Sequence, residues 1–292
     1  MKQELSILIP VFNYDCTHLV AQLCHLTEGI EAEIIVAEDG SSDHRTLAAN
    51  SRIHNLPRCR YICRKQNVGR AAIRNFLAHE SRFKWLLFLD CDMEIPDEQF
   101  ISRYLENDAQ DVIDGGFAVR ENKDNGPHNL RYLYEWTEQE RHNVYNRRKN
   151  PFRSFRTTNF MIRRDIIFAY PFNEKFRHYG YEDVFFGKCL KEQGFTIEHI
   201  DNAMILTDLE DNRTFIEKTE ESLRTLYEFR EELKGYSRLL TFVNGIHIST
   251  ITKLIRLWHR LFGSLERRNL YSRHPSLKLF RLYKIGYYLN LK

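Results

Sequence analysis

The fold is decided by one stretch in the first half of the chain, Trp85-Leu86-Leu87-Phe88-Leu89-Asp90-Cys91-Asp92, in which five apolar residues lead into two carboxylates one residue apart. An unbroken apolar run of this length is typical of a strand buried on both faces, as in a parallel sheet covered by helices. Side chains alternate along an extended backbone, so Asp90 and Asp92 are expected to point the same way. Two such carboxylates repel each other unless a cation lies between them, and Mg²⁺ or Mn²⁺ prefers oxygen ligands. The alternative is a polar strand end at which Asp92 begins a turn toward Pro96.

Strand and helix patterns alternate around this stretch. Apolar runs predict further strands at 5–9, 33–37, 60–63, 111–113 and 159–162, and two short ones within 195–206. Helical spacing of apolar residues predicts helices at 19–26, 68–78, 130–143 and 182–193, and an entirely helical segment after 211. Such alternation is typical of right-handed strand–helix–strand crossovers. We therefore expect an α/β fold with a mostly parallel, Rossmann-like central sheet, flanking helices and a C-terminal helical extension.

Composition excludes several classes of protein. The 292 residues are 42% hydrophobic and 28% charged, unlike a disordered, collagen-like or coiled-coil chain. The longest apolar runs fall far short of the roughly 20 residues that span a bilayer, and no apolar signal segment follows Met1 to Glu4, so we expect neither secretion nor a membrane span. The six cysteines are too sparse for a disulfide framework, and the histidines lack the spacing of a structural zinc site. A cytoplasmic protein with reduced thiols is expected.

Polar groups follow four of the predicted strands, at the edge where open α/β sheets bind their ligands. They are Pro10-Val11-Phe12-Asn13, Glu38-Asp39-Gly40-Ser41-Ser42-Asp43, Asn67-Val68-Gly69-Arg70 and Asp90-Cys91-Asp92. Ser42 or Asp43 is expected to cap a helix, which leaves Asp39 as an acceptor suited to a base N–H. Gly69 and Arg70 open a helix, where backbone N–H groups and a guanidinium both attract phosphate or a polar base edge.

A second acidic group stands at Tyr179-Gly180-Tyr181-Glu182-Asp183, where a helix is predicted to begin. Acidic residues are common in a first helical turn because the helix dipole favours them there. A helix start also holds its carboxylates rigidly, so one of the two is a candidate general base for a substrate hydroxyl.

Together these pieces resemble, in order and spacing, the inverting glycosyltransferases of family 2, which have the GT-A fold. The resemblance covers residues 4 to 210 and rests on 9–13, 38–43, 67–70 with Arg74-Asn75, 90–92 and 180–183. The segment 171–190 also resembles the acceptor-side segment of galactosyltransferase-like families.

The resemblance implies a nucleotide-sugar site on the first four motifs. Asp39 would hydrogen-bond the uracil of a UDP-sugar, with Pro10 and Phe12 bordering the base. Asp90 would contact the ribose, and Arg70 would contact the nucleotide. The nucleotide-sugar positions implied in this way are Pro10, Phe12, Asn13, Asp39, Asn67, Gly69, Arg70 and Asp90.

It also implies a metal site and a base. Asp92 would bind Mn²⁺ or Mg²⁺ in the Asp-x-Asp motif, next to Asp90. Many relatives have a metal-binding histidine where this chain has Leu206-Thr207-Asp208, so Asp208 stands as a substitute oxygen ligand. Asp183 would be the catalytic base, and Glu182 would contact sugar or acceptor hydroxyls.

The C-terminal segment differs in charge from the rest. Residues 235 to 292 contain 11 Lys or Arg and one acidic residue, Glu266, a net charge of +10, whereas the first 234 residues carry 32 Lys or Arg and 39 Asp or Glu, a net of −7. Apolar residues recur there at three- and four-residue spacing, at Ile251, Leu254, Ile255, Trp258, Leu261, Phe262 and Leu265. A basic amphipathic helix of this kind suits an anionic membrane surface. Alternatively, its apolar face packs on the catalytic domain or on a second copy in a homodimer. No nucleic-acid-binding module accompanies the charge.

These observations predict a catalytic domain at 1–210 and a helical, basic, amphipathic region at 211–292. We expect a cytoplasmic, metal-assisted hexosyl- or N-acetylhexosaminyl-transferase of polysaccharide biosynthesis, acting from a UDP-sugar on a glycan or lipid-linked glycan, and peripheral at the inner face of the membrane if the tail binds lipid. Two alternatives stay open: a nucleotidyltransferase, which needs no base at Asp183, and a non-catalytic nucleotide-sugar-binding scaffold, which needs no turnover.

Overall fold

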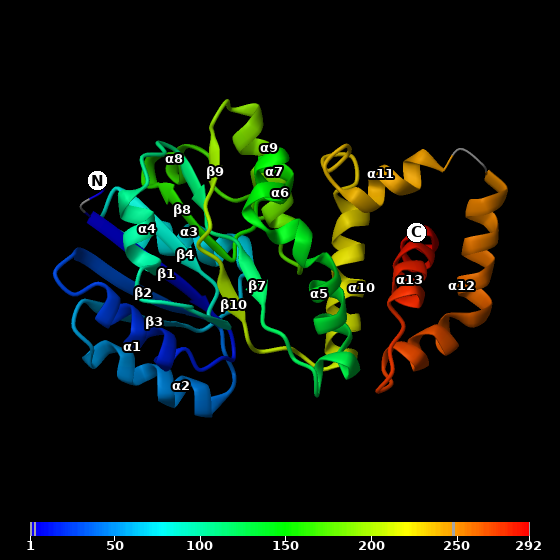
Figure 1. The fold of residues 1–292 in the computed structure, drawn as a ribbon, viewed down its shortest axis with the longest axis horizontal. Helices are drawn as coiled ribbons and strands as arrows, with labels where there is room; N and C mark the ends of the chain where they lie inside the picture. Colours follow the sequence, from blue (N-terminus) through cyan, green and yellow to red (C-terminus); the bar gives the residue numbers. More distant parts are fainter. Residues whose placement is uncertain (1, 3, 247–248, 292) are drawn as a thin grey trace. The chain divides into compact units, whose positions relative to one another are not determined.

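The computed structural model describes residue 2 and residues 4–246 and 249–291. The main sheet has seven strands in the order β3-β2-β1-β4-β8-β6-β9 (Figure 1). The strands are β1 (Glu4–Val11), β2 (Glu31–Asp39), β3 (Cys59–Arg64), β4 (Trp85–Leu89), β6 (Val112–Asp114), β8 (Asn159–Arg163) and β9 (Ile197–His199). Neighbouring strands are parallel except that β8 is antiparallel to β4 and β6. The expected α/β fold with a mostly parallel central sheet is confirmed.

The strands β1, β2 and β4 are almost entirely buried, whereas no residue of β3, at the edge of the sheet, is fully buried. Every residue of β4 is buried, and Phe88 stacks on Phe160 of β8 with ring centroids 4.9 Å apart. The helices associated with this sheet are α1 (Thr17–Leu26), α2 (His44–Asn50), η1 (Ser51–Asn55), α3 (Arg70–Glu80), α4 (Phe100–Glu106), α6 (Val144–Lys149), α7 (Pro151–Ser154) and α8 (Arg164–Ala169).

A small second sheet continues from the end of β4. It contains β5 (Met93–Glu94), β10 (Met204–Leu206) and β7 (Phe117–Val119), in the order β5-β10-β7. Strands β5 and β10 are antiparallel, with Leu206 opposite Met93. The pairing brings the chain that follows β10, at Thr207 and Asp208, next to the chain that precedes β5, at Cys91 and Asp92.

By its contacts the chain divides into two compact units, and neither is a continuous segment. Unit 1 comprises Met1–Ala118, Arg141–Arg177 and Phe186–Asp208, and unit 2 comprises Val119–Glu140, His178–Phe185 and Leu209–Lys292. Helices α5 (Leu130–His142) and α9 (Glu182–Glu192) each have residues in both units. The division at 210 and 211 into a catalytic domain and a helical region remains a prediction about function.

Unit 2 is helical beyond Asp211, as expected. Its further helices are η2 (Gly126–His128), α10 (Asn212–Glu228), α11 (Arg238–Gly245), α12 (Ser249–Leu270) and α13 (Leu277–Asn290). Its core gathers Leu130, Phe215, Ile216, Leu270, Phe280 and Tyr283. Within the described part of the chain, no helix is both long and apolar enough to cross a bilayer. All six cysteines are free thiols, and they range from buried (Cys16) to exposed (Cys63).

Candidate functional site

Asn13 joins the loops that follow β1 and β2. Its backbone lies in the left-handed region, with φ 51°. Its side-chain Oδ1 accepts the N–H groups of Ser42 (2.7 Å) and Asp43 (2.9 Å), and its own N–H donates to Ser41 Oγ (2.8 Å). Asp43 caps α2 by accepting the N–H of Arg45, as the sequence predicted for Ser42 or Asp43. Asn13 therefore shapes the loop after β2.

Asp39 ties the end of β2 to the loop before α3. Its carboxylate oxygens accept the backbone N–H groups of Val68 (2.9 Å) and Gly69 (3.0 Å). Burial raises the pKa of Asp39, and these two N–H groups partly offset that effect. Gly69 has φ +88° and a Cβ there would lie 2.8 Å from the carbonyl oxygen of Arg177, so glycine is required at this position. Sequence analysis missed this role of Asp39; its role toward a base stays a prediction.

The other predicted nucleotide positions lie around this loop and the end of β1. Asn67 and Arg70 are exposed, and Pro10 is half-buried. The ring of Phe12 is 52% exposed, which is high for a large apolar side chain at the end of a buried strand. Arg70 begins α3. The charge of Arg70 acts on Cys91: burial raises the pKa of that thiol well above its usual value, and Arg70 opposes the rise.

Asp90 is held by an ion pair with α3. Its Oδ1 accepts from Nη2 of Arg74 at 2.9 Å, and the Arg74 side chain is 1% exposed. The next residue of α3, Asn75, exchanges hydrogen bonds with the backbone of Phe172, using its Nδ2 and Oδ1 at 2.9 Å each. The Arg74-Asn75 pair thus fixes Asp90 with one side chain and the segment at 172 with the other.

Asp208 and Asp92 are brought to the same place by strand pairing. Because Leu206 lies opposite Met93 in an antiparallel pair, the residues just after β10 run beside the residues just before β5. Both carboxylates act electrostatically on the hydroxyl of Tyr14. Burial raises the pKa of Tyr14 to about 12, and the negative charges of Asp208 and Asp92 contribute to this increase. Acidic charge is therefore concentrated beside Tyr14 at the end of β4.

This pair of carboxylates fits a hard divalent cation, which takes carboxylate oxygens together with water and substrate phosphates. Among the residues that the structure describes, no three His, Cys, Asp or Glu side chains form a preassembled metal cluster. Asp90 belongs to the predicted set with Asp92 and Asp208, yet one of its oxygens already accepts from Arg74. The metal roles of these three residues stay predictions.

The turn before α9 has an unusual backbone. Gly180 and Tyr181 both have positive φ, 95° and 70°. Glycine adopts this region freely, whereas for a tyrosine it costs on the order of 1 kcal/mol or more. Glu182 and Asp183 follow at once as the first two residues of α9; Glu182 is 6% exposed, and Asp183 is half-buried.

Helix α10 holds this turn in place. A Cβ on Gly180 would lie 2.7 Å from the Cβ of Ser222, so the two segments touch closely. The N–H of Tyr179 donates to Oε1 of Glu221 (3.0 Å), and the hydroxyl of Thr225 donates to the Tyr179 carbonyl (3.1 Å). Nothing in the local pattern of 178–183 signals this contact with a helix some forty residues later.

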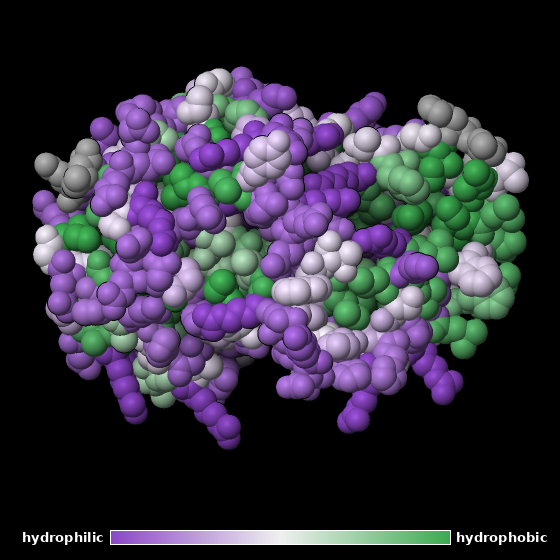
Figure 2. Space-filling model, in the orientation of Figure 1, coloured by the Kyte–Doolittle hydropathy of each residue, from purple (hydrophilic) through white to green (hydrophobic). Residues whose placement is uncertain are grey.

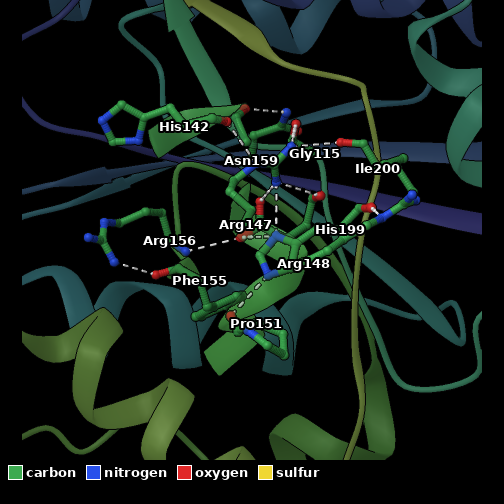
Figure 3. Close-up of polar contacts among 12 residues, drawn as sticks. Gly115, His142, Arg147, Arg148, Pro151, Phe155, Arg156, Asn159, His199 and Ile200 are labelled. Carbon is green, nitrogen blue, oxygen red and sulfur yellow. Dashed lines mark hydrogen bonds and ion pairs between the residues drawn. The ribbon is translucent and has the colours of Figure 1, made fainter. Parts of the chain in front are cut away.

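A buried arginine organises the ends of β6 and β9, and sequence analysis missed it. Arg147 donates to Asp114 Oδ1 (2.9 Å) and to the carbonyls of Gly115 (3.0 Å) and Ile200 (2.7 Å), as Figure 3 shows. Its guanidinium occupies the space that a Cβ on Gly116 would need, 2.6 Å from Cζ. In the sequence, Arg147 stands in the basic run Arg147-Arg148-Lys149, which is typical of an exposed segment. The pair Gly115-Gly116 was the sequence signal that another group packs closely against the backbone there.

Arg147 also defines the state of His199. An arginine can only donate, so Nδ1 of His199 accepts from Arg147 (2.9 Å), and Nε2–H donates to the carbonyl of Pro151 (2.9 Å) (Figure 3). Burial lowers the pKa of His199, which agrees with a neutral ring. This network fixes the chain just beyond β6 and β9, at the carboxyl end of β6.

With this geometry established, comparison with known proteins identifies the family. The family model described as "Glycosyl transferase family 2" matches residues 6–169. The chain belongs to glycosyltransferase family 2. Chondroitin synthase of Escherichia coli is 26% identical over 235 residues, covering 68% of this chain and 34% of that protein. Chondroitin synthase of Pasteurella multocida (strain Pm70) is 25% identical and covers 68% of this chain and 24% of that protein. The family 2 chain thus spans about a third or less of the curated relatives it matches.

Solved structures confirm the GT-A fold. S. aureus TarS 1-349 has a TM-score of 0.53 at 18% identity, over 98% of this chain and 89% of that chain. The mannosyltransferase PcManGT from Pyrobaculum calidifontis, in complex with GDP-Man and Mn²⁺, has a TM-score of 0.60 at 10% identity, over 99% of this chain and 85% of that chain. TarS has also been solved with UDP-GlcNAc, at a TM-score of 0.51, 16% identity and coverage of 98% and 89%.

Proposed function

We propose that this family 2 enzyme is an inverting glycosyltransferase that moves a hexosyl or N-acetylhexosaminyl group from a UDP-linked donor to a glycan or lipid-linked glycan acceptor in polysaccharide biosynthesis. One observation carries the proposal: the β5–β10 pairing brings the chain at Asp208 alongside the chain at Asp92, two residues after the Asp90 that Arg74 holds. TarS with UDP and UDP-GlcNAc, and the chondroitin synthases by name, support the choice of donor and product class.

The donor nucleotide is bound by groups of unit 1. Each oxygen of Asp39 accepts one N–H and keeps a lone pair, so the carboxylate can also accept the N–H of uracil. The exposed ring of Phe12 offers an apolar face to the base. The free oxygen of Asp90 accepts a ribose hydroxyl while its other oxygen stays on Arg74.

The residues around Asp92 meet the diphosphate. Asp92 with Asp208 would hold Mn²⁺ or Mg²⁺, which would neutralise the charge that develops on the departing diphosphate. Arg70, at the start of α3 and close enough to influence Cys91, adds positive charge on the same side. The N-terminus of α3 adds backbone N–H groups that favour phosphate.

Asp183 accepts the proton of the acceptor hydroxyl as that oxygen attacks the anomeric carbon. Attack from the face opposite the leaving diphosphate inverts the configuration. Glu182, buried at the start of α9, orients sugar or acceptor hydroxyls by hydrogen bonds. The left-handed turn at 180–181 fixes the direction in which both carboxylates leave the backbone.

Calorimetric titration of UDP in the presence of Mn²⁺ and then in excess EDTA tests the donor half of the proposal. We expect binding that EDTA abolishes and that Asp92→Ala weakens about tenfold or more, because Asp92 would hold the cation that neutralises the charge of the diphosphate. Asp108→Ala is the matched control, since Asp108 precedes β6, which runs parallel to β4, and therefore lies toward the amino ends of these strands.

A parallel titration with GDP tests which nucleobase the donor carries. Tighter binding of GDP than of UDP would replace the uridine donor by a guanosine one. Failure of both nucleotides to bind with Mn²⁺, or full UDP affinity in Asp92→Ala, would contradict the proposed donor site.

A further inference from the structure

Helix α12 exposes a continuous apolar stripe. Seven large apolar side chains of this helix are between 37% and 63% exposed: Ile251, Leu254, Leu257, Trp258, Leu261, Phe262 and Leu265. We call these residues the α12 stripe. Figure 2 shows hydrophobic residues gathered on the surface of this part of the chain. Single exposed apolar residues are ordinary, but a contiguous set along one helix face marks a surface that binds something.

The opposite side of α12 is occupied by α13, which lies alongside it (Figure 1). A Cβ on Gly286 would lie 2.7 Å from the Cβ of His259, so the two helices approach very closely there. Leu270 is fully buried in the core that α12 and α13 share. This packing fixes the rotation of α12, and the stripe is the face that it leaves exposed.

Charge along the exposed side of α12 is of one sign. Lys253, Arg256, Arg260 and Arg268 are exposed. The single acidic residue of 235–292, Glu266, is 3% exposed. Its carboxylate accepts from Trp258 Nε1 (2.8 Å) and pairs with His259 Nδ1 (2.7 Å), so it is turned inward and neutralises none of these cations.

We propose that the α12 stripe docks on an anionic lipid bilayer, with the helix in the plane of the headgroups. Apolar side chains then enter the boundary with the acyl chains, and the flanking cations meet lipid phosphates. A second copy seated symmetrically on the same stripe would bring identical cationic surfaces together without any acidic partner from 235–292. Charge complementarity therefore favours the bilayer. This inference does not depend on the proposed donor or acceptor.

Vesicle flotation of the full chain tests the docking. We expect co-flotation with vesicles of phosphatidylglycerol and phosphatidylcholine in equal parts, much weaker flotation with phosphatidylcholine alone, and weaker binding in high salt. Leu254→Glu/Leu261→Glu should lower the bound fraction about tenfold or more, since it places two charges in the apolar face. Phe168→Glu is the matched control: Phe168 is 42% exposed on α8 of unit 1, and the change should leave flotation unaltered.

A second variant separates the electrostatic contribution. Lys253→Gln/Arg256→Gln keeps the stripe and should reduce binding to the anionic vesicles along with its salt dependence. Circular dichroism and thermal melting establish that each variant folds. Absence of wild-type flotation on anionic vesicles would overturn the inference, as would undiminished flotation of the folded double glutamate variant.

Size-exclusion chromatography with light scattering tests whether a second copy of the chain, instead of a bilayer, covers the α12 stripe. A wild-type dimer that Leu254→Glu/Leu261→Glu dissociates, with no vesicle binding by either protein, would assign the stripe to a second copy instead. UDP binding is measured on the same samples. Flotation without UDP binding would sustain the docking and contradict the proposed function, and the reverse result would do the opposite.

Discussion

The acidic groups of unit 1 and unit 2 are held in place by different means. In unit 1, Asp90 emerges from a regular strand and is fixed by a charge, the buried guanidinium of Arg74 at 2.9 Å. In unit 2, Glu182 and Asp183 follow a left-handed turn that is fixed by backbone shape against α10. A carboxylate of the first kind is sensitive to the loss of its partner's charge, whereas one of the second kind is sensitive to any added atom in the turn. The tests below separate these two sensitivities.

The largest expected effect is on turnover. Asp183→Asn keeps the shape of the side chain but removes its basicity, so kcat should fall about 100- to 10,000-fold while the Kd for UDP is unchanged. The rate is measured as UDP release from the UDP-sugar that supports wild-type turnover. Glu192→Gln, at the other end of α9, is the matched control and should retain the wild-type rate. Full activity of Asp183→Asn would show that Asp183 is not the catalytic base and would favour the alternative of a nucleotidyltransferase.

A large loss of stability is expected from the ion pair of unit 1. Arg74→Met leaves the partly buried Asp90 carboxylate without the buried guanidinium that pairs with it, which should lower the free energy of unfolding by about 3 kcal/mol in urea denaturation. Arg74→Met/Asp90→Asn should recover part of that loss, because no unpaired charge remains. Arg60→Met breaks the exposed pair with Glu80 and should cost less than about 1 kcal/mol. Equal losses in the two single variants would show that Asp90 is not held by charge.

The turn of unit 2 should respond to a single methyl group. Gly180→Ala forces a left-handed alanine against Ser222 and should cost about 2 kcal/mol and lower kcat, since α9 begins two residues later. Gly194→Ala is matched, with φ +77° and no atom within 4 Å of the added Cβ, so it should cost about 1 kcal/mol. Adding Ser222→Gly to Gly180→Ala should restore only the part of the lost stability by which Gly180→Ala exceeds Gly194→Ala. If both glycine variants lose the same stability, α10 does not constrain the turn.

The smallest effect is a pH dependence in unit 1. The folded protein keeps His199 neutral because burial lowers its pKa below the ordinary histidine value of about 6.5, whereas the unfolded chain protonates it below that pH. The unfolded state therefore binds more protons, and stability should fall as pH drops below 6.5 toward the folded pKa, by at most about 1.4 kcal/mol per pH unit. His199→Asn retains an acceptor for Arg147 and should show a shallower slope in the same urea titrations. An unchanged slope would assign the pH dependence to other groups.

Much of the fold was predictable because burial on both faces leaves a direct mark on the sequence. The apolar runs that became β1 and β4 lie at the centre of the sheet, so almost every side chain in them is apolar. The two-residue strand β5 carries no such pattern and was missed. Arg147 was missed for a related reason: its own segment reads as an exposed basic run, and the carbonyls and the carboxylate that surround it come from distant parts of the chain.

The candidate site divides in the same way. The residues of each motif were visible because strand ends and helix starts favour particular residue types, and Asp43 capped its helix as expected. The second use of Asp39, which holds the loop at Val68 and Gly69, was not visible, because hydrogen bonds to backbone N–H groups depend on where a distant loop passes.

By itself the sequence determined the seven strands of the main sheet, the helices α1, α3, α5 and α9, the polar groups at the strand ends, and the basic amphipathic pattern of α12. All of these depend on residues within a few positions of one another. Tertiary structure alone decided that Asp208 comes beside Asp92, that α10 supports the turn at Gly180, and that Glu266 is turned inward so that the exposed side of α12 is cationic. The physical reason is that strand register and helix packing join segments far apart in the chain, and no local pattern of residues specifies which segments will meet.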